Sequence, residues 1–453
     1  MKKGFYIVGG AVRDYYLYIK EHGHISFYDF KKRELVHDFD YIAYKYTEDE
    51  MLSLGFQKVG KDFPVFLEPL TGNEYALTRT ERSTGPGYKD FKFEVGVSME
   101  EDLKRRDLTM NSMALSESDK FIDPFNGRQD IDNKILRHTS EAFKEDPLRV
   151  LRIARFRAKY PDFEIAKETV ELINSMKNML TSLSKDRVFK ELEKALSEKA
   201  PYMFFITLKE LGVLDIVFPE IYSWTRVNHE NKYHMEGSVF NHSMLVLKTI
   251  SEISKDPITR FGALFHDIGK VPVFEKDGKF HRHASADIVI DLFKSLKDNY
   301  RIPTKYIKIA EMAAINHHKI YNVPNIKNSS IVKMITSKKF PKEESDLKRV
   351  LDIAVADSYG RIIHVSGPRK VLELYDSLYA VDFAEYKKGE RQYESVYTSG
   401  KYKREDFVEK DFIEKAFKAI QKVNVRDFVK NETSVLRIKQ ELHRRRIRAV
   451  ASI

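Results

Sequence analysis

The chain has 453 residues and no cysteine, which excludes disulfides, thiolate catalysis and cysteine-based zinc sites. Its Lys and Arg outnumber its Asp and Glu by 78 to 68, a net charge of +10, and this balance favours a polyanionic partner such as nucleic acid. The length predicts two to four domains. No apolar run reaches the roughly 18 residues of a membrane span. Together with the lack of cysteine, this predicts a cytoplasmic protein without a membrane partner.

The first third of the chain predicts a mixture of strands and helices. Short β-prone runs are "FYIVGG" at 5–10, "FDYIAY" at 39–44 and "FKFEVGV" at 91–97, each bounded by glycine, charged or turn residues. From "EDPLRVLRIARF" at 145–156 onward, apolar residues recur every three or four positions, which is the helical period. The sequence therefore predicts an α+β protein that is mostly α, with a mixed sheet confined to an N-terminal head.

A glycine turn and an aspartate pair mark the head. Gly10 stands between the first strand and a helix, where backbone N–H groups can approach phosphate oxygens, and Arg13 lies on the first turn of that helix. Asp38 and Asp40 are two apart in a β-prone run and share one face. Alone, this spacing is also typical of a solvated strand edge. Beside the glycine turn, it predicts Mg²⁺ ions for nucleotidyl transfer.

A basic helix follows the head. Asp146 before Pro147 is expected to cap it, with the proline at its first position. Arg149, Arg152 and Arg155 then recur every three residues. An isolated segment of this kind is typical of a salt-bridged surface helix. A carboxylate beside a guanidinium, however, offers the acceptor and donor that match cytosine and adenine and mismatch uracil and guanine.

Histidines and aspartates suggest a metal site in the helical part. His242 lies on a helical segment, His266 and Asp267 are adjacent in what the pattern predicts as an apolar helix, and Asp357 follows later. Burying such groups unpaired is costly, and a divalent metal removes that cost. Ligands of this kind suit Ni²⁺, Mn²⁺, Fe²⁺, Mg²⁺ or Zn²⁺, and such a metal can activate water for hydrolysis of phosphate esters.

The order of the motifs resembles the bacterial-type tRNA nucleotidyltransferases, the CCA-adding enzymes of the polymerase β superfamily. The resemblance rests on the glycine turn with Arg13, on Asp38-Phe39-Asp40, on "KRRDLTMNSMAL" and on "EDPLRVLRIARF". It implies a polymerase-β-like head that adds C, C and A to tRNA from CTP and ATP. It implies nucleotide binding by Gly10, Arg13, Arg106, Asp146, Arg149, Arg152 and Arg155, and Asp107 and Asn111 match the same motifs by pattern.

"FHDIGK" resembles the HD phosphohydrolase superfamily, and a subgroup of the CCA-adding enzymes carries such a domain. That resemblance implies His242, His266, Asp267 and Asp357 as ligands of Ni²⁺, Mn²⁺ or Mg²⁺. It implies 2′,3′-cyclic phosphodiesterase, 2′-nucleotidase and phosphatase activity. His283 and His317 match positions that hold substrate or a second metal, whereas His281 and His318 are expected to be surface histidines.

Three alternatives stay open. A poly(A) polymerase tends to have an arginine pair where this chain has Gly60-Lys61-Asp62, and a CC-only enzyme usually lacks a loop like "RTERSTGPGYKDF" at 79–91. Full CCA addition is therefore favoured. The third is an HD nucleotide phosphohydrolase with a non-catalytic RNA-binding head. The segment 16–37 is longer than is usual in the family and predicts a surface loop or an extra hairpin.

Four domains are predicted, and the last is basic. They are the head at 1–144, a helical neck that reads nucleotide and binds RNA at 145–225, the HD domain at 226–365 and a helical tail at 366–453. The tail ends in "LRIKQELHRRRIRAV" at 436–450. This amphipathic helix is expected either to be a solvated surface helix or to contact tRNA phosphates. Both a monomer and a dimer agree with the sequence.

Overall fold

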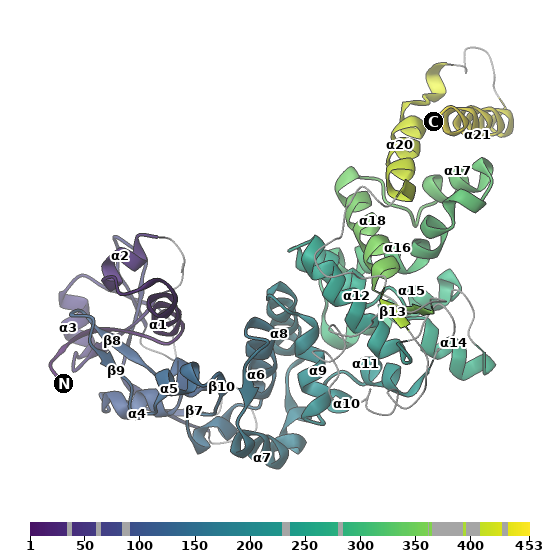
Figure 1. Ribbon diagram of the computed structural model, residues 1–453. Coiled ribbons are helices and arrows are strands. Elements are labelled where there is room, and N and C mark those ends of the chain that lie inside the picture. The colour runs from purple at the N-terminus through teal and green to yellow at the C-terminus, as the bar shows by residue number, and fades with distance from the viewer. Residues whose placement is uncertain are drawn as a thin grey trace. The chain divides into compact units, whose positions relative to one another are not determined.

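The computed structural model of the protein describes residues 1–33, 39–59, 65–83, 91–228, 236–279, 284–360, 362–364, 393–395, 408–427 and 434–453. Its contacts divide the chain into two compact units, Met1–Ser184 and Lys185–Ile453 (Figure 1). The predicted boundary at 144/145 lies inside the first unit, and those at 225/226 and 365/366 lie inside the second; all three stay predictions. Among the described helices, none has both the length and the apolar character needed to cross a membrane.

The first unit alternates short strands with helices up to residue 136 and is mainly helical afterwards. Its elements are β1 (Gly4–Val8), α1 (Gly10–His22), α2 (Phe27–Lys31), β2 (Asp40–Tyr44), α3 (Glu48–Ser53), β3 (Gln57–Val59), β4 (Val65–Leu67), β5 (Glu74–Leu77), β6 (Arg79–Ser83), β7 (Phe91–Val95), α4 (Met99–Lys104), η1 (Thr109–Asn111), β8 (Ala114–Ser116), β9 (Phe121–Ile122), α5 (Gly127–Asp132), β10 (Ile135–Leu136), η2 (Glu141–Glu145), α6 (Leu148–Lys159), β11 (Glu164–Ile165), α7 (Lys167–Met176) and η3 (Lys177–Ser182). The three predicted strands are β1, β2 and β7.

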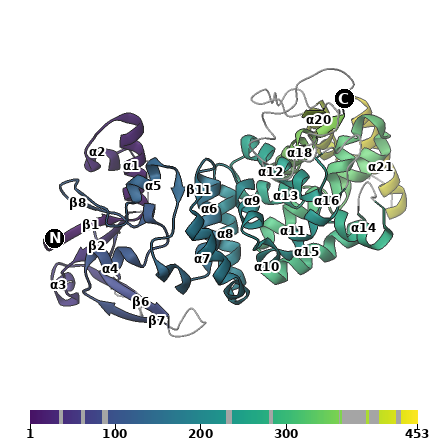
Figure 2. The same ribbon diagram turned by 60° about the horizontal axis from the view of Figure 1, so that its bottom comes forward.

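A mixed sheet forms the centre of this unit. Its strand order is β3-β4-β5-β2-β1-β8-β9, with β1 antiparallel to β2 and β2 parallel to β5. Side chains alternate between the two faces of a strand. Val8 and Ile42 therefore share one face, where they pack against Met99 and Leu103 of α4. Strands β6 and β7 form a separate antiparallel ribbon (Figure 2). The predicted mixed sheet in the head is confirmed.

The segment after the glycine turn is mostly helical where the structure describes it, so the predicted surface loop or hairpin was wrong. Helix α1 continues to His22, and α2 follows after Ser26, whose hydroxyl accepts the N–H of Asp29. Phe27 and Phe30, three apart and on one face of α2, are buried with ring centroids 5.2 and 5.4 Å from that of Tyr15. A cap and an aromatic face therefore make this insertion a helix. Residues 34–38 lie outside the described part.

The second unit is built from helices. Its elements are α8 (Lys185–Ser197), α9 (Tyr202–Glu210), α10 (Leu214–Val217), α11 (Pro219–Ser223), η4 (Trp224–Arg226), α12 (Val239–Ile253), α13 (Pro257–Leu264), α14 (Lys270–Asp277), α15 (Ala286–Tyr300), α16 (Thr304–Tyr321), η5 (Val323–Asn325), α17 (Asn328–Thr336), α18 (Glu344–Tyr359), β12 (Ile362–His364), β13 (Tyr393–Ser395), α20 (Val408–Lys422), η8 (Val425–Asp427) and α21 (Val435–Ala451). The prediction of a mostly helical chain after residue 145 is confirmed.

Helices α12, α13, α16 and α18 pack against one another (Figure 2). Gly262 of α13 lies so close to its neighbours that an added Cβ would stand 2.6 Å from Cδ1 of Ile353 in α18. A residue without a side chain therefore permits the close approach of these two helices. Because of this packing, the first turn of α12, the C-terminal end of α13 and the last turns of α18 lie close together.

The two C-terminal helices share a hydrophobic core with α16, α17 and α18. Phe417 of α20 and Val450 of α21 are buried in the same cluster as Val350 and Leu351. The predicted amphipathic helix at 436–450 is α21. Within the second unit, α20 and α21 are therefore joined by apolar packing to the helices of the predicted HD domain.

Candidate active sites

The glycine turn, Asp40 and Arg106 meet at one point of the head. In the register of β1 and β2, Val8 lies opposite Asp40, so the turn after β1 adjoins this carboxylate. Gly9 has φ 73°, and a Cβ there would stand 3.0 Å from Nη1 of Arg106 and 3.9 Å from Oδ2 of Asp40. Only glycine fits both the backbone angle and the space. Asp38, the predicted partner of Asp40, lies outside the described residues.

Arg13 is buried and held by partners within the unit. Its Nε and Nη2 donate to the two carboxylate oxygens of Asp14 at 2.8 and 3.0 Å, and its Nη1 donates to Oδ1 of Asn111 at 2.6 Å. Its guanidinium carbon lies 5.4 and 5.7 Å from the ring centroids of Phe156 and Tyr160. Arg13 therefore links α1 to η1 through Asn111 and to α6 through Phe156. Its contact with the triphosphate stays a prediction.

Asp107 is the centre of a second buried network. Its Oδ2 accepts hydrogen bonds from Nε and Nη2 of Arg152 at 2.8 and 2.6 Å, and its Oδ1 accepts from Nδ2 of Asn111 at 3.0 Å. Burial alone raises the pKa of this carboxyl, but the Arg152 charge and these hydrogen bonds hold it well below its usual range. Asn111 contacts both Arg13 and Asp107, so the two networks are continuous.

The predicted base-reading pair lies at the start of α6. Arg149 donates from Nη1 to the carbonyl of Ala142 at 2.7 Å and from Nη2 to the carbonyl of Arg105 at 2.6 Å, which fixes the plane of its guanidinium. The helix begins at Leu148, one residue later than predicted, and Oδ1 of Asp146 accepts the Leu148 N–H at 3.1 Å. Asp146 and Arg149 are thus both held by hydrogen bonds to the backbone at the start of α6.

The third arginine of this helix is held differently. The guanidinium carbon of Arg155 lies 4.8 Å from the ring centroid of Phe156. Arg149, Arg152 and Arg155 therefore contact backbone carbonyls, a carboxylate and an aromatic ring, in that order. Arg149 and Arg152 therefore also hold this helix against the head, whereas the contact of Arg155 lies within α6.

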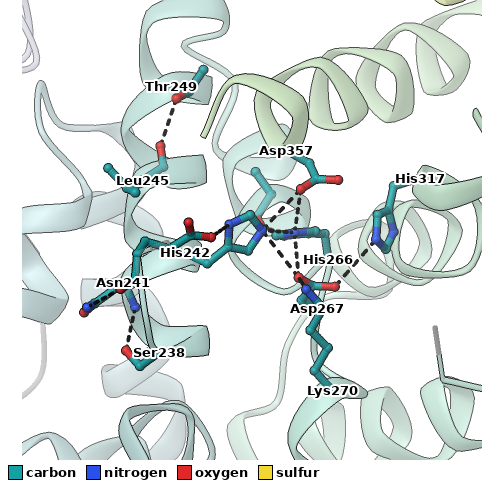
Figure 3. A network of polar contacts seen from close by, with 12 residues as sticks. Ser238, Asn241, His242, Leu245, Thr249, His266, Asp267, Lys270, His317 and Asp357 are labelled. Atoms are coloured by element: carbon teal, nitrogen blue, oxygen red, sulfur yellow. Dashed lines mark hydrogen bonds and ion pairs between the residues drawn. The ribbon is translucent and has the colours of Figure 1, made fainter. Parts of the chain in front are cut away.

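In the second unit, four predicted metal ligands converge (Figure 3). Nε2 of His242 lies 3.2 Å from Nε2 of His266, 3.4 Å from Oδ2 of Asp267 and 3.2 Å from Oδ1 of Asp357. Nε2 of His266 lies 3.2 and 3.6 Å from the same two oxygens. All four residues are buried. The prediction that distant segments bring these side chains together agrees with the geometry.

The local structure around His266 differs from the prediction. Helix α13 ends at Leu264 and α14 begins at Lys270, so His266 and Asp267 lie on the turn between them and not inside a helix. On a helix, adjacent side chains point about 100° apart; on this turn both reach the same centre. The ring of His266 is held through Nδ1, 2.7 Å from the carbonyl of Ala263, which leaves Nε2 to face the other ligands.

The electrostatics of this centre suit a cation. Burial lowers the pKa of His266, but the Asp267 and Asp357 carboxylates raise it to about 10. Lys270 and His266 hold the pKa of Asp267 well below its usual value despite burial. Two carboxylates and two imidazole nitrogens within a few ångströms form a donor set that fits a divalent metal. In the metal-free protein, a proton on His266 offsets part of the negative charge of the two carboxylates.

His317 borders the same centre, from α16. Its Nε2 lies 3.6 Å from Oδ1 of Asp267, and its Nδ1 lies 3.0 Å from the carbonyl of Ala313. His266, Asp267 and His317 form a second trio with metal-ligand spacing. His318 is half-buried, with its ring centroid 4.0 Å from that of His317, so its expected surface position was wrong.

His281 and His283 lie outside the described residues, so their predicted positions stay untested. Two further residues of the centre were missed. Glu236 is buried, with Oε1 2.9 Å from Nδ1 of His242, and Lys270 places Nζ 2.7 Å from Oδ2 of Asp267. For Lys270 the signal was present in "FHDIGK", three residues after the aspartate; for Glu236 no local pattern pointed to it.

Three family models match successive parts of the chain. Residues 5–137 match the family model described as "Poly A polymerase head domain", residues 162–224 match "Probable RNA and SrmB- binding site of polymerase A", and residues 239–362 match "HD domain". The matches follow the chain in the order that the motifs predicted.

Curated relatives decide the family. The "Multifunctional CCA protein" of Mannheimia succiniciproducens is 40% identical over 368 residues, which cover 79% of this chain and 84% of the relative. That of Shewanella denitrificans is 39% identical over 362 residues, with the same coverage of both chains. The chain belongs to the multifunctional CCA protein family. The predicted resemblance to nucleotidyltransferases with an appended HD domain is thereby confirmed.

Solved structures show the same fold. A CCA-adding enzyme described as apo form II is similar with a TM-score of 0.58 and 17% identity, over 99% of this chain and 90% of that one. The Bacillus stearothermophilus CCA-adding enzyme in complex with CTP is similar with a TM-score of 0.56 and 19% identity, over 99% and 89%. This chain therefore shares with these enzymes a fold in which a mixed-sheet head is followed by helices.

Proposed function

We propose that the chain adds C, C and A to the 3′ end of tRNA, using CTP and ATP as substrates. Membership of the multifunctional CCA family supports this. The observation that carries it is the meeting of Asp40, Arg106 and the Gly9 turn at one point of the head. A carboxylate, a cation and the start of a helix are the groups that a nucleoside triphosphate with Mg²⁺ requires.

Each residue of the head has a proposed task. Asp38 and Asp40 hold Mg²⁺, and in such sites two ions activate the attacking hydroxyl and stabilise the charge on the departing pyrophosphate. Gly10, at the start of α1, and Arg106 bind phosphate oxygens, with Arg13 supporting the turn or joining them. The carboxylate of Asp40 lies at the strand end, next to the turn that receives the triphosphate.

Base selection is proposed for Asp146 and Arg149. The guanidinium of Arg149 is fixed by two backbone carbonyls, so it presents its remaining N–H groups in one orientation. A fixed donor beside a carboxylate acceptor suits cytosine and adenine and opposes uracil and guanine. Arg152 and Arg155 are proposed to hold the nucleotide from the same helix.

An addition assay tests this function. Trimmed tRNA with CTP and ATP is expected to gain two C and one A, whereas UTP or GTP is expected to give no comparable product. Asp40→Ala is expected to abolish addition, and Asp49→Ala, an exposed change in α3, serves as its control. Unchanged addition by Asp40→Ala would exclude the proposed site, and A-only tailing would favour the poly(A) polymerase alternative.

We propose a second activity, metal-dependent hydrolysis of phosphoesters, in the second unit. The supporting observation is the buried convergence of His242, His266, Asp267 and Asp357. A divalent ion such as Ni²⁺, Mn²⁺ or Mg²⁺ in such a set supplies Lewis-acid activation of a phosphate and of the attacking water. The proposed substrates are 2′,3′-cyclic phosphates, 2′-nucleotides and phosphomonoesters, with His283 and His317 binding substrate or a second metal.

Hydrolysis is tested separately from addition. The full chain is stripped with a chelator, reloaded with each metal in turn and assayed on 2′,3′-cyclic AMP, 2′-AMP and p-nitrophenyl phosphate. Asp357→Asn is expected to abolish hydrolysis with every metal and to leave CCA addition unchanged. Loss of both activities in a folded variant would contradict separate sites. Location in the cytoplasm, and the choice between monomer and dimer, stay predictions.

A further inference from the structure

A cavity of about 630 Å³ opens in the second unit beside the end of α16, η5 and α17. Its volume is in the range of pockets that hold small ligands. None of the four proposed metal ligands lines it. The cavity is therefore distinct from the His–Asp centre, and neither proposed reaction uses it.

The polar lining of this cavity suits an anion. Two lysines line it, Lys319 of α16 and Lys333 of α17, and both are exposed. Within the described part of the chain, neither makes an ion pair, and no carboxylate is among the lining residues. Amides and hydroxyls complete the polar lining: Asn322, Asn325, Ser330 and Ser337. Ammonium, amide and hydroxyl groups together can all donate to a phosphate.

Charges behind this lining add to the positive potential. Nζ of Lys342 donates to the carbonyl of Ser337 at 2.6 Å and to that of Ile335 at 3.2 Å. A further basic group thus stands close to the wall at Ser337. Coulomb attraction in such surroundings favours an anionic ligand over a neutral one.

The rest of the lining is apolar and aromatic. Ile326 and Met334 supply aliphatic and thioether surface, and His318 supplies a ring. Flat rings and apolar side chains are surfaces on which nucleobases stack. The cavity therefore combines a phosphate-binding part with a base-binding part.

We propose that this cavity binds a nucleoside monophosphate, with the phosphate between Lys319 and Lys333 and the base against Ile326, Met334 and His318. His318, which lines the cavity, directly follows His317 in α16, and His317 borders the His–Asp centre. Binding here requires no metal, so the proposal stands independently of the hydrolytic activity.

Methionine-methyl NMR on the full chain tests the proposal at the cavity itself. The protein is labelled with [¹³C-methyl]methionine and treated with a chelator, and the Met334 resonance is assigned with Met334→Leu. AMP is expected to shift this resonance saturably. Lys319→Ala and Lys333→Ala are each expected to weaken binding about tenfold, as for loss of one charge-assisted contact. Lys338→Ala, an exposed change outside the lining, is the matched control.

Three outcomes would overturn the proposal. No saturable shift of the Met334 resonance would exclude a nucleotide in the cavity. Adenosine binding as tightly as AMP, or unchanged affinity in both lysine variants, would exclude the phosphate contact. Inorganic phosphate binding as tightly as AMP would exclude the base contact and leave only a general anion site. Because no metal is present and no turnover is measured, failure of phosphoester hydrolysis would not produce any of these results.

Discussion

Buried polar side chains in both proposed sites are held by partners from other segments of the chain. Asp107 is fixed by Arg152 of α6 and by Asn111 of η1, while His242 of α12 is fixed by Glu236, which precedes that helix. A buried charge without such partners costs several kcal/mol. The partners therefore stabilise the orientation of each of these groups.

Glu236→Gln is expected to weaken metal binding at the His–Asp centre. The Glu236 carboxylate lies 2.9 Å from Nδ1 of His242, and its negative charge beside that nitrogen helps to hold the ring with Nε2 toward the other ligands. Loss of such a partner typically lowers metal affinity about 10- to 100-fold. Competition with a metal-sensitive chelator measures the change. Glu344→Gln, an exposed change in α18, is the control; equal affinity in both variants would argue against this role.

Asp107→Asn is expected to destabilise the first unit by about 3 kcal/mol at neutral pH, the usual cost of breaking a buried ion pair. Because Arg152 and Asn111 depress the folded pKa of Asp107 below its unfolded value of about 3.9, its stabilisation is present above that value. It is lost as the pH falls further. The difference in unfolding free energy between wild type and variant should therefore shrink below about pH 4. Urea titrations at pH 7 and pH 3 measure it, and a constant difference would contradict the assignment.

At the scale of elements, helix α6 combines packing with proposed recognition. Its apolar side chains are buried, and its arginines contact the head through carbonyls and a carboxylate. The helix thus presents Asp146 and Arg149 on a rigid support. Recognition by such a support depends on the shape of the guanidinium and not only on its charge.

Arg149→Lys is expected to lower kcat/KM for CTP and ATP by about 10- to 100-fold, the worth of one bidentate base contact. Lysine keeps the charge but cannot span the carbonyls of Ala142 and Arg105 or offer a planar pair of donors. Discrimination against UTP and GTP should fall as well. Single-nucleotide addition to trimmed tRNA gives both quantities. Lys144→Ala in η2 is the control, and undiminished discrimination in Arg149→Lys would remove the residue from base selection.

The sequence predicted elements with clear periodicity and missed those that depend on tertiary contacts. Strands β1 and β2 and helices α6 and α21 follow directly from their patterns. The segment at 16–37 was expected to be a loop or hairpin because it is longer than is usual in the family. In the structure, Phe27 and Phe30 pack on Tyr15, a contact that the sequence alone does not show. His266 and Asp267 were placed in a helix because apolar neighbours extend through the turn. Glu236 could not be found, since only the fold brings it to His242.

At the scale of the whole molecule, the excess positive charge is relevant to binding of tRNA. Helix α21 carries several basic residues, and Arg444 and Arg448 are exposed on it. Its other face is packed, because Val450 is buried in the core shared with α17 and α20. Deletion of this helix would therefore disturb the fold of the second unit as well as its charge, so substitutions at exposed positions are the cleaner test of a contact with RNA.

Arg444→Ala with Arg448→Ala is expected to raise the KM for tRNA and to reduce the slope of log affinity against log salt by about 1.5, because each phosphate contact contributes roughly 0.7 to 0.9. Lys294→Ala with Lys305→Ala removes the same charge from exposed positions on α15 and α16 and is the control. Binding of tRNA measured between 50 and 300 mM KCl separates the two cases. A direct contact changes the slope only in the α21 variant, whereas a general effect of net charge changes both equally. An unchanged slope in the α21 variant would leave this helix as a solvated surface element whose charge serves solubility alone.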